Sequence, residues 1–330
     1  MHELELLRHA PGPDLSGLLA DAEKFLKASK APSTTKAYDS DLRAYLAFCT
    51  CNNFPYLPTT VEAVVLYISS LASVAPPLAF STINRRLAAI TFAHRRRGLD
   101  SPATPSKHYL LREVMGGIRR TLGAAPQGAD PLLSDAIRRI AAACPDTLLG
   151  TRDRALILLG YAMGSRRSEL ASVLEVRDLT FTAQGLYIVL RHHKTERFEA
   201  SPRTIAVPFG EHKDTCPVGA VKVWIEAAGI GETQSSLFRA VDRHGSLGKK
   251  ALAPRSIAKI LAKAVTRAGG AEGKISTHSL RSGMCTQAAI NGAEERDIAR
   301  TTGHRSTGMV RRYIRDADLF RANASAKLGL

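Results

Sequence analysis

Apolar side chains recur every three or four positions through four or five stretches in the first third of the chain. These stretches cover residues 15–30, 34–51, 60–73, 80–97 and 106–121, and each is bounded by Pro, Gly, Ser or Thr. The spacing is typical of amphipathic α-helices, and the bounding residues favour helix ends. The pattern therefore predicts an all-helical first domain.

The second of these stretches has one continuous apolar stripe. Ser33 or Thr34 is suited to cap its N-terminus, and the stripe that follows consists of Tyr38, Leu42, Tyr45 and Leu46. We expect this stripe to be buried.

The fourth stretch combines an apolar stripe with a group of arginines. The stripe consists of Ile83, Leu87 and Ile90. At about 100° per residue, Arg85 and Arg96 fall opposite the stripe, Arg95 lies to one side, and Arg86 and Arg97 lie along its edge. We expect most of this charge to face solvent or a binding partner.

The clearest boundary in the chain is the segment GAAPQGADP, residues 123–131. It contains small residues, Gly and Pro, and it has no apolar periodicity, which is typical of a linker. The sequence thus predicts an N-terminal domain over residues 1–122, a linker over 123–131 and a second domain over 132–330.

The second domain shows helical spacing at first, then alternation, then helical spacing again. Leu186, Ile188 and Leu190 alternate with other residues, as do Ile205 and Val207, which favours strands. We expect helices at 133–144, 150–163 and 167–173, strands at 177–181, 185–191 and 203–207, and helices at 216–227, 254–268, 278–291, 294–301 and 306–314. The fold class is therefore mainly α, with a small antiparallel β-sheet in the second domain.

The composition excludes several classes of protein. With 330 residues, 45% hydrophobic and 23% charged, the chain is typical of a globular protein of about two domains. No apolar run approaches the roughly 20 residues that span a bilayer, and the first residues lack the pattern of a secretion signal. The five Cys are scattered and form no CxxC pair, so we expect neither a disulfide framework nor a zinc module. These features predict a cytoplasmic protein.

The net charge indicates a polyanionic partner. Lys and Arg number 46 and Asp and Glu number 30, which leaves +16, and both predicted domains share the excess. Such a surplus favours nucleic acid, although a solubilised surface is the alternative. Our candidate DNA contacts in the first domain are Lys36, Arg85, Arg86, Arg95, Arg96 and Arg97. A solvated helix face is the alternative for these residues as well.

The second domain carries a set of short motifs with titratable side chains. GSRRSEL at 164–170 places Arg166 at a helix start, and RHHKTERF places Lys194 in a turn between two strands. THSLRSG places a histidine and an arginine three residues apart on one helix face, and TGHRS is followed by RRYIR. Each motif alone has a structural explanation, such as a surface ion pair, a helix cap or a core aromatic residue. The residues of interest in the last two motifs are His278, Arg281, His304 and Tyr313.

Taken together and in this order, the motifs resemble those of the tyrosine site-specific recombinases of the phage integrase family, and the resemblance covers nearly the whole chain. In that family the active site follows the order Arg, Lys, His, Arg, His or Trp, Tyr. The order is matched here by Arg166, Lys194, His278, Arg281, His304 and Tyr313. Glu169 stands where the family commonly has an acidic residue, and its role is either structural or directly chemical. One departure is Arg167, where the family usually has an apolar residue. The register of GxRxxEL favours Arg166 as the inward arginine.

The resemblance implies an enzyme that cleaves and rejoins DNA by phosphoryl transfer, without a metal ion, ATP or other cofactor. Tyr313 attacks the phosphodiester and holds the 3′-phosphate as a covalent ester. Arg166 and Arg281 bind the nonbridging oxygens and stabilise their charge. Lys194 protonates the leaving 5′-oxygen, while His278 acts as general acid or base. His304 is expected to hydrogen-bond the phosphate.

The resemblance also implies an architecture and an assembly. A helical N-terminal core-binding domain and an α+β catalytic domain would form a C-shaped clamp on duplex DNA that carries inverted-repeat recombination sites. Strand exchange through a Holliday junction would take place in a homotetramer of two dimers. Residues 317–330 would form a tail that docks on a neighbouring protomer or on its own domain. The resemblance implies a nucleoid-associated protein, encoded by a bacterium or by a mobile element. It implies no membrane partner.

Two other functions are compatible with parts of the pattern. A type IB topoisomerase uses similar chemistry to relax supercoiled DNA, but it needs no synapse of paired sites. A non-catalytic DNA-binding regulator would keep the fold and the basic surface without the reaction. The sequence does not determine the target site, the accessory factors or the biological role.

Overall fold

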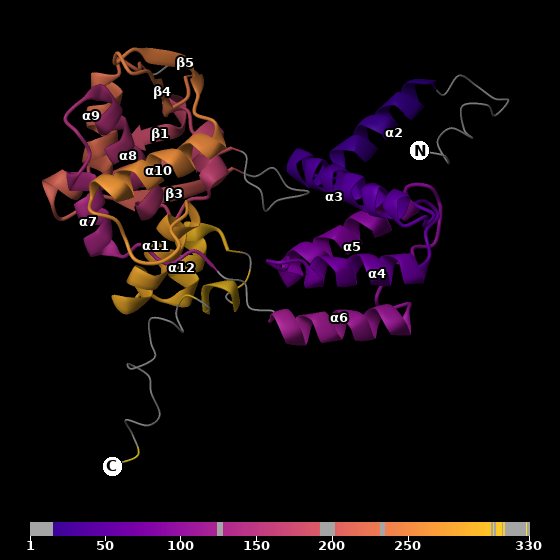
Figure 1. The fold of residues 1–330 in the computed structure, drawn as a ribbon. Helices are drawn as coiled ribbons and strands as arrows, with labels where there is room; N and C mark the ends of the chain where they lie inside the picture. Colours follow the sequence, from indigo (N-terminus) through magenta and orange to yellow (C-terminus); the bar gives the residue numbers. More distant parts are fainter. Residues whose placement is uncertain are drawn as a thin grey trace. The chain divides into compact units, whose positions relative to one another are not determined.

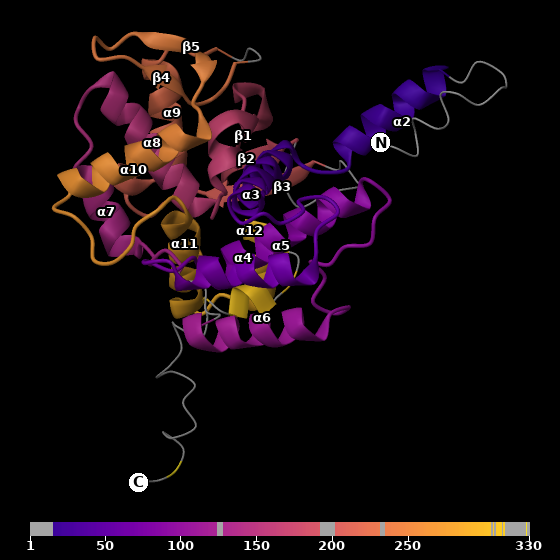
Figure 2. The same ribbon diagram turned by 45° about the vertical axis from the view of Figure 1, so that its right-hand side comes forward.

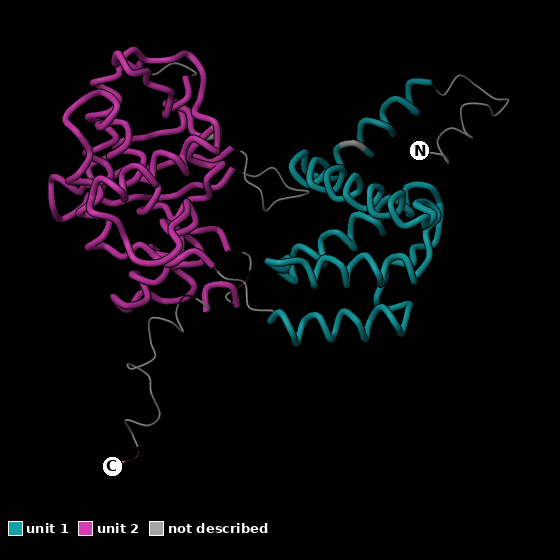
Figure 3. The backbone as a smooth tube through the Cα atoms, viewed as in Figure 1, with its two compact units in different colours: residues 1–127 teal, residues 128–330 magenta. Residues whose placement is uncertain are grey.

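The fold is known from a computed structural model, which describes residues 16–123, 128–191, 202–231 and 235–304, together with 306, 308–311, 313 and 328. The chain divides between Gln127 and Gly128 into two compact units (Figure 3). Residues 128–131 of the predicted linker belong to the second unit. There Asp130 donates its backbone N–H to the Lys274 carbonyl at 3.0 Å and accepts the Lys274 N–H at 2.6 Å. Residues 124–127 of the predicted linker lie outside the described residues.

The first unit contains the five predicted helices, with ends that differ from the prediction by at most three residues (Figure 1). A helix begins at Val61 because Thr60 caps it, the threonine side chain accepting the Ala63 N–H at 3.2 Å. The helices are α2 (Ser16–Ala28), α3 (Pro32–Cys51), α4 (Val61–Ser73), α5 (Phe80–Arg95) and α6 (Tyr109–Leu122).

The core of the first unit forms where α3 packs on α5 and α4 packs on α6. The predicted stripe of α5, Ile83, Leu87 and Ile90, is buried there, which confirms that prediction. The prediction for α3 was wrong at Leu46, which is 44% exposed. The buried positions of α3 are Asp41, Tyr45 and Cys49, spaced four apart, and Leu46 is rotated by about 100° from that line.

The second unit is a helical bundle with two small sheets (Figures 1 and 2). Its central element is α8 (Leu148–Ala162), which begins at the Thr147 cap and contacts four other helices. Because neighbours surround it, α8 buries apolar residues on several faces. The other helices are α7 (Ser134–Ala142), α9 (Pro217–Ala227), α10 (Pro254–Arg267), α11 (His278–Ile290) and α12 (Glu295–Thr302), with short turns η1 (Glu169–Val173), η2 (Val176–Asp178) and η3 (Lys213–Thr215).

The predicted three-stranded sheet is present and antiparallel. Its strands are β1 (Leu179–Phe181), β2 (Gly185–Leu190) and β3 (Arg203–Pro208), in the order β1-β2-β3. Ile188 pairs with Ile205, and Leu186 pairs with Val207. All four of these side chains are buried, so the alternation in the sequence indicated the inner face correctly.

A second sheet was not predicted. The strands β4 (Arg239–Val241) and β5 (Leu247–Ala251) pair antiparallel in the region after α9. At the connecting turn the Asp242 carboxylate accepts the N–H groups of His244 and Ser246 at 2.8 and 2.9 Å, and Gly245 has φ +84°. The two strands are short and polar, so they lack the apolar alternation on which the prediction relied.

Several predicted features can be compared only in part. Residues 308–311 and 313 are helical, as expected for 306–314. Lys194 lies outside the described residues, and so does the tail 317–330 apart from Leu328. No helix in the described parts of the chain has the length and apolar character required to cross a membrane.

Candidate active site

The site begins at a tight turn after α8. Gly164 has φ +53°, and a Cβ added there would lie 2.7 Å from the Thr302 Cγ2 atom. Glycine is therefore required both by the backbone conformation and by the close approach of the end of α12. The Ser165 N–H bonds to the Gly160 carbonyl at 3.1 Å, which closes the turn and directs Arg166 toward α12.

Arg166 is held by a buried carboxylate. Its backbone N–H donates to Glu169 Oε2 at 2.8 Å, and its Nη1 donates to Glu169 Oε1 at 2.9 Å. Its Nη2 donates to the Gly303 carbonyl at 3.3 Å. Glu169 is 1% exposed, whereas Arg167 is exposed. Arg166 is thus the arginine that points inward, in the register that the sequence favours.

Arg281 joins three segments of the second unit. Its side chain is buried on α11, and its Nη1 donates to the Gly164 carbonyl at 2.6 Å and to the Thr302 carbonyl at 2.7 Å. Both bonds use the same nitrogen, and no hydrogen bond to a described residue engages Nη2 or Nε, so this edge of the guanidinium is able to bind an anion. Arg281 therefore holds the three segments together through Nη1 and is able to bind an anion through its other edge.

His278 and Tyr313 are in direct side-chain contact. The His278 Nε2 atom lies 2.8 Å from the Tyr313 hydroxyl oxygen, and the two ring centroids are 6.3 Å apart. His278 is at the first position of α11, and Tyr313 comes from the helical residues after α12. At this distance the imidazole is able to accept the phenolic proton directly.

His304 lies on the other side of the tyrosine. Its ring centroid is 6.0 Å from that of Tyr313, and its Nδ1 is 2.6 Å from the Thr302 hydroxyl. The Thr302 hydroxyl donates its one proton to the Ile298 carbonyl at 2.6 Å. The hydroxyl must then accept from the histidine, so Nδ1 carries the proton. This places the second ring nitrogen, Nε2, on the side away from Thr302.

The electrostatics of the site are dominated by guanidinium groups. Burial, and then the charges of Arg281 and Arg166, lower the pKa of His304 to about 4. Desolvation followed by the same two arginines also lowers the pKa of His278. Burial, and then the charge of Arg166, lower the pKa of Arg281 to about 10, so Arg281 stays charged at neutral pH. Both histidines are therefore neutral at pH 7 beside fixed positive charges.

The structure brings most of the residues of the sequence pattern into one place. These are Arg166, Glu169, His278, Arg281, His304 and Tyr313, from segments that are up to about 150 residues apart in the chain. Lys194 lies outside the described residues. Sequence reasoning missed Arg203, whose Nη2 is 3.9 Å from Glu169 Oε2. The signal for it was present, because a basic residue occupies a core-facing position of the alternating strand β3.

The candidate DNA contacts of the first unit differ in their environments. Arg85 forms an ion pair with the buried Asp41, and Arg86 donates to the Tyr67 hydroxyl at 2.8 Å. These two arginines are thus partly engaged within the unit. The remaining candidates are exposed: Lys36, Arg95, Arg96 and Arg97.

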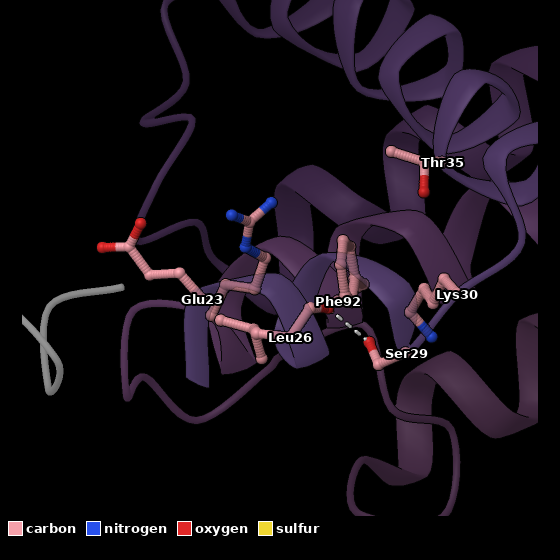
Figure 4. Close-up of a pocket in the computed structure, with 7 residues that line it drawn as sticks. Glu23, Leu26, Ser29, Lys30, Thr35 and Phe92 are labelled. Carbon is pink, nitrogen blue, oxygen red and sulfur yellow. Dashed lines mark hydrogen bonds between the residues drawn. The ribbon is translucent and has the colours of Figure 1, made fainter. Parts of the chain in front are cut away.

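Arg96 also borders a small pocket of about 180 Å³ between α2, α3 and α5 (Figure 4). Its guanidinium carbon lies 5.6 Å from the centroid of the Phe92 ring, and the Lys30 ammonium lies 4.8 Å from the same centroid. The Ser29 hydroxyl closes the end of α2 by donating to the Leu26 carbonyl at 2.8 Å. Cation–π contacts of this kind hold Lys30, between α2 and α3, and Arg96, at the end of α5, against the Phe92 ring.

Comparison with known proteins identifies the family of the chain. The model of the phage integrase family matches residues 131–319. A relative described as "Integrase/recombinase xerD homolog", from Selenomonas ruminantium, is 35% identical over 320 residues, which is 97% of this chain and 92% of the relative. The fold resembles the Tn1549 transposon integrase in complex with transposon right end DNA, with TM-score 0.60, 16% identity and coverage of 93% of this chain and 96% of that one. It also resembles a lambda integrase tetramer bound to a Holliday junction, with TM-score 0.55, 15% identity and coverage of 94% and 84%.

The chain belongs to the phage integrase family. Within that family it is a tyrosine recombinase, similar in sequence to the XerD and XerC recombinases.

Proposed function

We propose that this protein is a site-specific DNA recombinase that cleaves and rejoins strands through a covalent 3′-phosphotyrosine at Tyr313 and a Holliday junction. The observation that carries the proposal is the 2.8 Å contact between His278 Nε2 and the Tyr313 hydroxyl, beside two arginines. A tyrosine hydroxyl is a weak nucleophile at neutral pH, and a neutral imidazole within hydrogen-bond reach activates it.

In the proposed reaction the Tyr313 oxygen attacks the phosphorus while its proton passes to His278. The bond between phosphorus and the 5′-oxygen breaks, and the 5′-oxygen leaves with a proton, which the family resemblance assigns to Lys194. Arg281 and Arg166 stabilise the charge that spreads over the nonbridging oxygens. The ester keeps the phosphodiester bond energy, so a 5′-hydroxyl from another strand reverses the step without ATP. The guanidinium groups supply the positive charge, and the proposal includes no metal or cofactor.

The two units have separate tasks in this proposal. The helical first unit binds the core of the recombination site, and the second unit carries the chemistry. The active protein is a homotetramer of two dimers on two inverted-repeat sites, with the C-terminal tail 317–330 exchanged between protomers. The fold similarity to integrases solved on DNA and on a Holliday junction supports this assignment.

The test uses a library of genomic fragments with nicks, which trap the covalent intermediate by loss of the short 5′-fragment. DNA that remains attached to the protein after denaturation is sequenced for the wild type, for Tyr313→Phe and for the control Tyr187→Phe. Tyr187 lies on β2 of the same unit and is 41% exposed. We expect the wild type and the control to trap one discrete inverted repeat and Tyr313→Phe to trap nothing.

Other outcomes favour the other functions. Trapping without site preference, together with relaxation of supercoiled plasmid, indicates a topoisomerase-like enzyme. DNA binding without trapping by the wild type indicates a non-catalytic regulator. Equal trapping by the wild type and Tyr313→Phe would falsify the assignment of the nucleophile.

A further inference from the structure

Arg203 is a charged residue on the inner face of a strand. The odd positions of β3, Arg203, Ile205 and Val207, point to the same side of the sheet, and the two apolar ones are buried. The Arg203 side chain is only 18% exposed, and its residue pairs with the fully buried Leu190 of β2. Strand alternation predicts an apolar residue here, so the charge at this position needs an explanation.

The guanidinium of Arg203 lies between two segments that carry the site. Its Nη2 is 3.9 Å from Glu169 Oε2. On the other side it lies against Gly303, where an added Cβ would be 1.8 Å from Nη1 and 2.7 Å from the guanidinium carbon. Gly303 also has φ +67°, so its backbone adopts a conformation that glycine favours. The absence of a side chain at residue 303 is what allows Arg203 to reach this position.

Glu169 and Gly303, two contact partners of Arg203, also contact a residue of the proposed mechanism. The Glu169 carboxylate that faces Arg203 also binds the backbone and the Nη1 of Arg166. The Gly303 carbonyl accepts from Arg166 Nη2 at 3.3 Å, and the next residue is His304. Arg203 thus touches the support of Arg166 on one side and the turn before His304 on the other.

The positive charge of Arg203 also affects the pKa of a histidine in the site. Arg203 is one of the cations that lower the pKa of His304, after burial, Arg281, Arg166 and His278. Because Glu169 is nearly fully buried and faces two guanidiniums, removing one of them changes the charge balance around the carboxylate. The pKa of His304 therefore reports on the position of the Arg203 charge.

We propose that Arg203 is a positioning residue for DNA cleavage, which orients the Glu169 carboxylate toward Arg166 and supports the turn that carries His304. In this proposal Arg203 acts through Glu169 and the turn at Gly303, and the groups that act on the phosphate are Arg166, Arg281 and Tyr313. The inference rests on the proposed function for its effect on cleavage, whereas its effect on His304 does not depend on that function.

The first experiment compares Arg203→Met with the control Arg267→Met. Arg267 is also partly exposed, at 31%, and faces a buried carboxylate, Asp153, at 3.5 Å, but it is not in the site. Single-turnover cleavage of a nicked substrate and DNA affinity are measured for each. A misplacement of about 1 Å in an active site costs a rate factor of the order of a hundred, so we expect that loss for Arg203→Met with DNA affinity within about threefold. Arg203→Lys keeps the charge without the planar fork and should recover part of the rate.

The second experiment measures the His304 titration by NMR of histidines labelled at Cε1, assigned with His304→Gln. We expect the His304 midpoint to rise above the wild-type value of about 4 in Arg203→Met, to stay near it in Arg203→Lys, and to be unchanged in Arg267→Met. This measurement is informative even if the protein cleaves no DNA, so it separates failure of the inference from failure of the proposed function.

The third experiment tests the contact itself with Gly303→Ala in two backgrounds. In the wild type the new Cβ collides with the Arg203 guanidinium, whereas in Arg203→Ala that collision is absent. We expect Gly303→Ala to shift the His304 midpoint and lower the cleavage rate more in the wild type than in Arg203→Ala. Additive effects of the two substitutions, an unchanged His304 midpoint in Arg203→Met, or a loss of cleavage that only follows a loss of fold or DNA affinity would each overturn the inference.

Discussion

The contact between His278 and Tyr313 leads to a quantitative prediction about the pH dependence of cleavage. Only the neutral imidazole accepts the tyrosine proton, and desolvation together with Arg281 and Arg166 lowers the pKa of His278 below its ordinary value of 6.5. The cleavage rate should therefore be level from pH 7 down to 6.5. It should then fall about tenfold per pH unit once the pH drops below the lowered pKa, because the protonated fraction of His278 grows.

The size of the effect follows from the role of a general base. Such a group contributes about 10²- to 10⁴-fold to a rate, which corresponds to about 3 to 5 kcal/mol of transition-state stabilisation. His278→Ala removes the imidazole whose Nε2 lies 2.8 Å from the Tyr313 hydroxyl oxygen, so the hydroxyl loses this proton acceptor. We expect single-turnover cleavage to slow by that factor, and the fall at low pH to disappear, while Arg281 and Arg166 still bind the phosphate.

The assay is single-turnover cleavage of a nicked substrate between pH 5 and 8, with covalent protein–DNA adducts resolved on denaturing gels. His244→Ala is the control, because His244 is exposed in the β4–β5 turn of the same unit. The reasoning is refuted if His278→Ala cleaves within about threefold of the wild type. It is also refuted if the variant keeps the decline of the wild type at low pH.

Three further substitutions are expected to change the stability of the units in urea. His94→Leu should destabilise the first unit by about 1 to 3 kcal/mol, because the buried Thr59 N–H loses its acceptor at 3.2 Å, and circular dichroism follows this transition. Burial lowers the pKa of His94 in the folded state, so the wild type should lose stability as the pH falls below 6.5, and the variant should not. Gly283→Ala should destabilise the second unit by at least about 1 to 3 kcal/mol, measured by fluorescence of the single tryptophan, since its Cβ would lie 1.9 Å from the Leu132 carbonyl oxygen. Gly116→Ala, with open space around it in α6, should instead stabilise the first unit by about 0.5 to 1 kcal/mol, and a loss of stability there would contradict the reasoning.

Regular spacing in the sequence predicted most of the fold. The stripe of Ile83, Leu87 and Ile90 and the alternation in β2 and β3 each depend on one face of an element being buried, and that face is visible in a single sequence. The β4–β5 sheet was missed because its strands carry Lys and Arg and form no continuous apolar face. Leu46 was misplaced because the buried line of α3 includes a charged residue, Asp41, which pairs with Arg85.

The chemistry of the site was predicted by motif order rather than by geometry. Nothing local in the sequence places Arg281 against the Gly164 carbonyl, 117 residues away. The alternation of β3 marks Arg203 as a basic residue at a core-facing position, but its partners Glu169 and Gly303 are distant in sequence and lie on different elements, so the sequence does not show what it contacts. Such contacts follow from the packing of the whole unit, which a single sequence does not specify.

In the proposed mechanism, the arrangement of charge connects binding of the phosphate with activation of the nucleophile. Arg166 and Arg203 face a single buried carboxylate, Glu169, and the buried Arg281 adds a third positive charge, so the site keeps a positive excess that favours an anion. Desolvation, and then the charges of Arg281 and Arg166, lower the pKa of His278, which keeps the imidazole neutral and able to accept the tyrosine proton. A site with fewer cations would bind the phosphate less tightly and would also protonate its base at a higher pH. In the proposed mechanism the guanidinium groups therefore keep the base neutral and also stabilise the charge of the transition state.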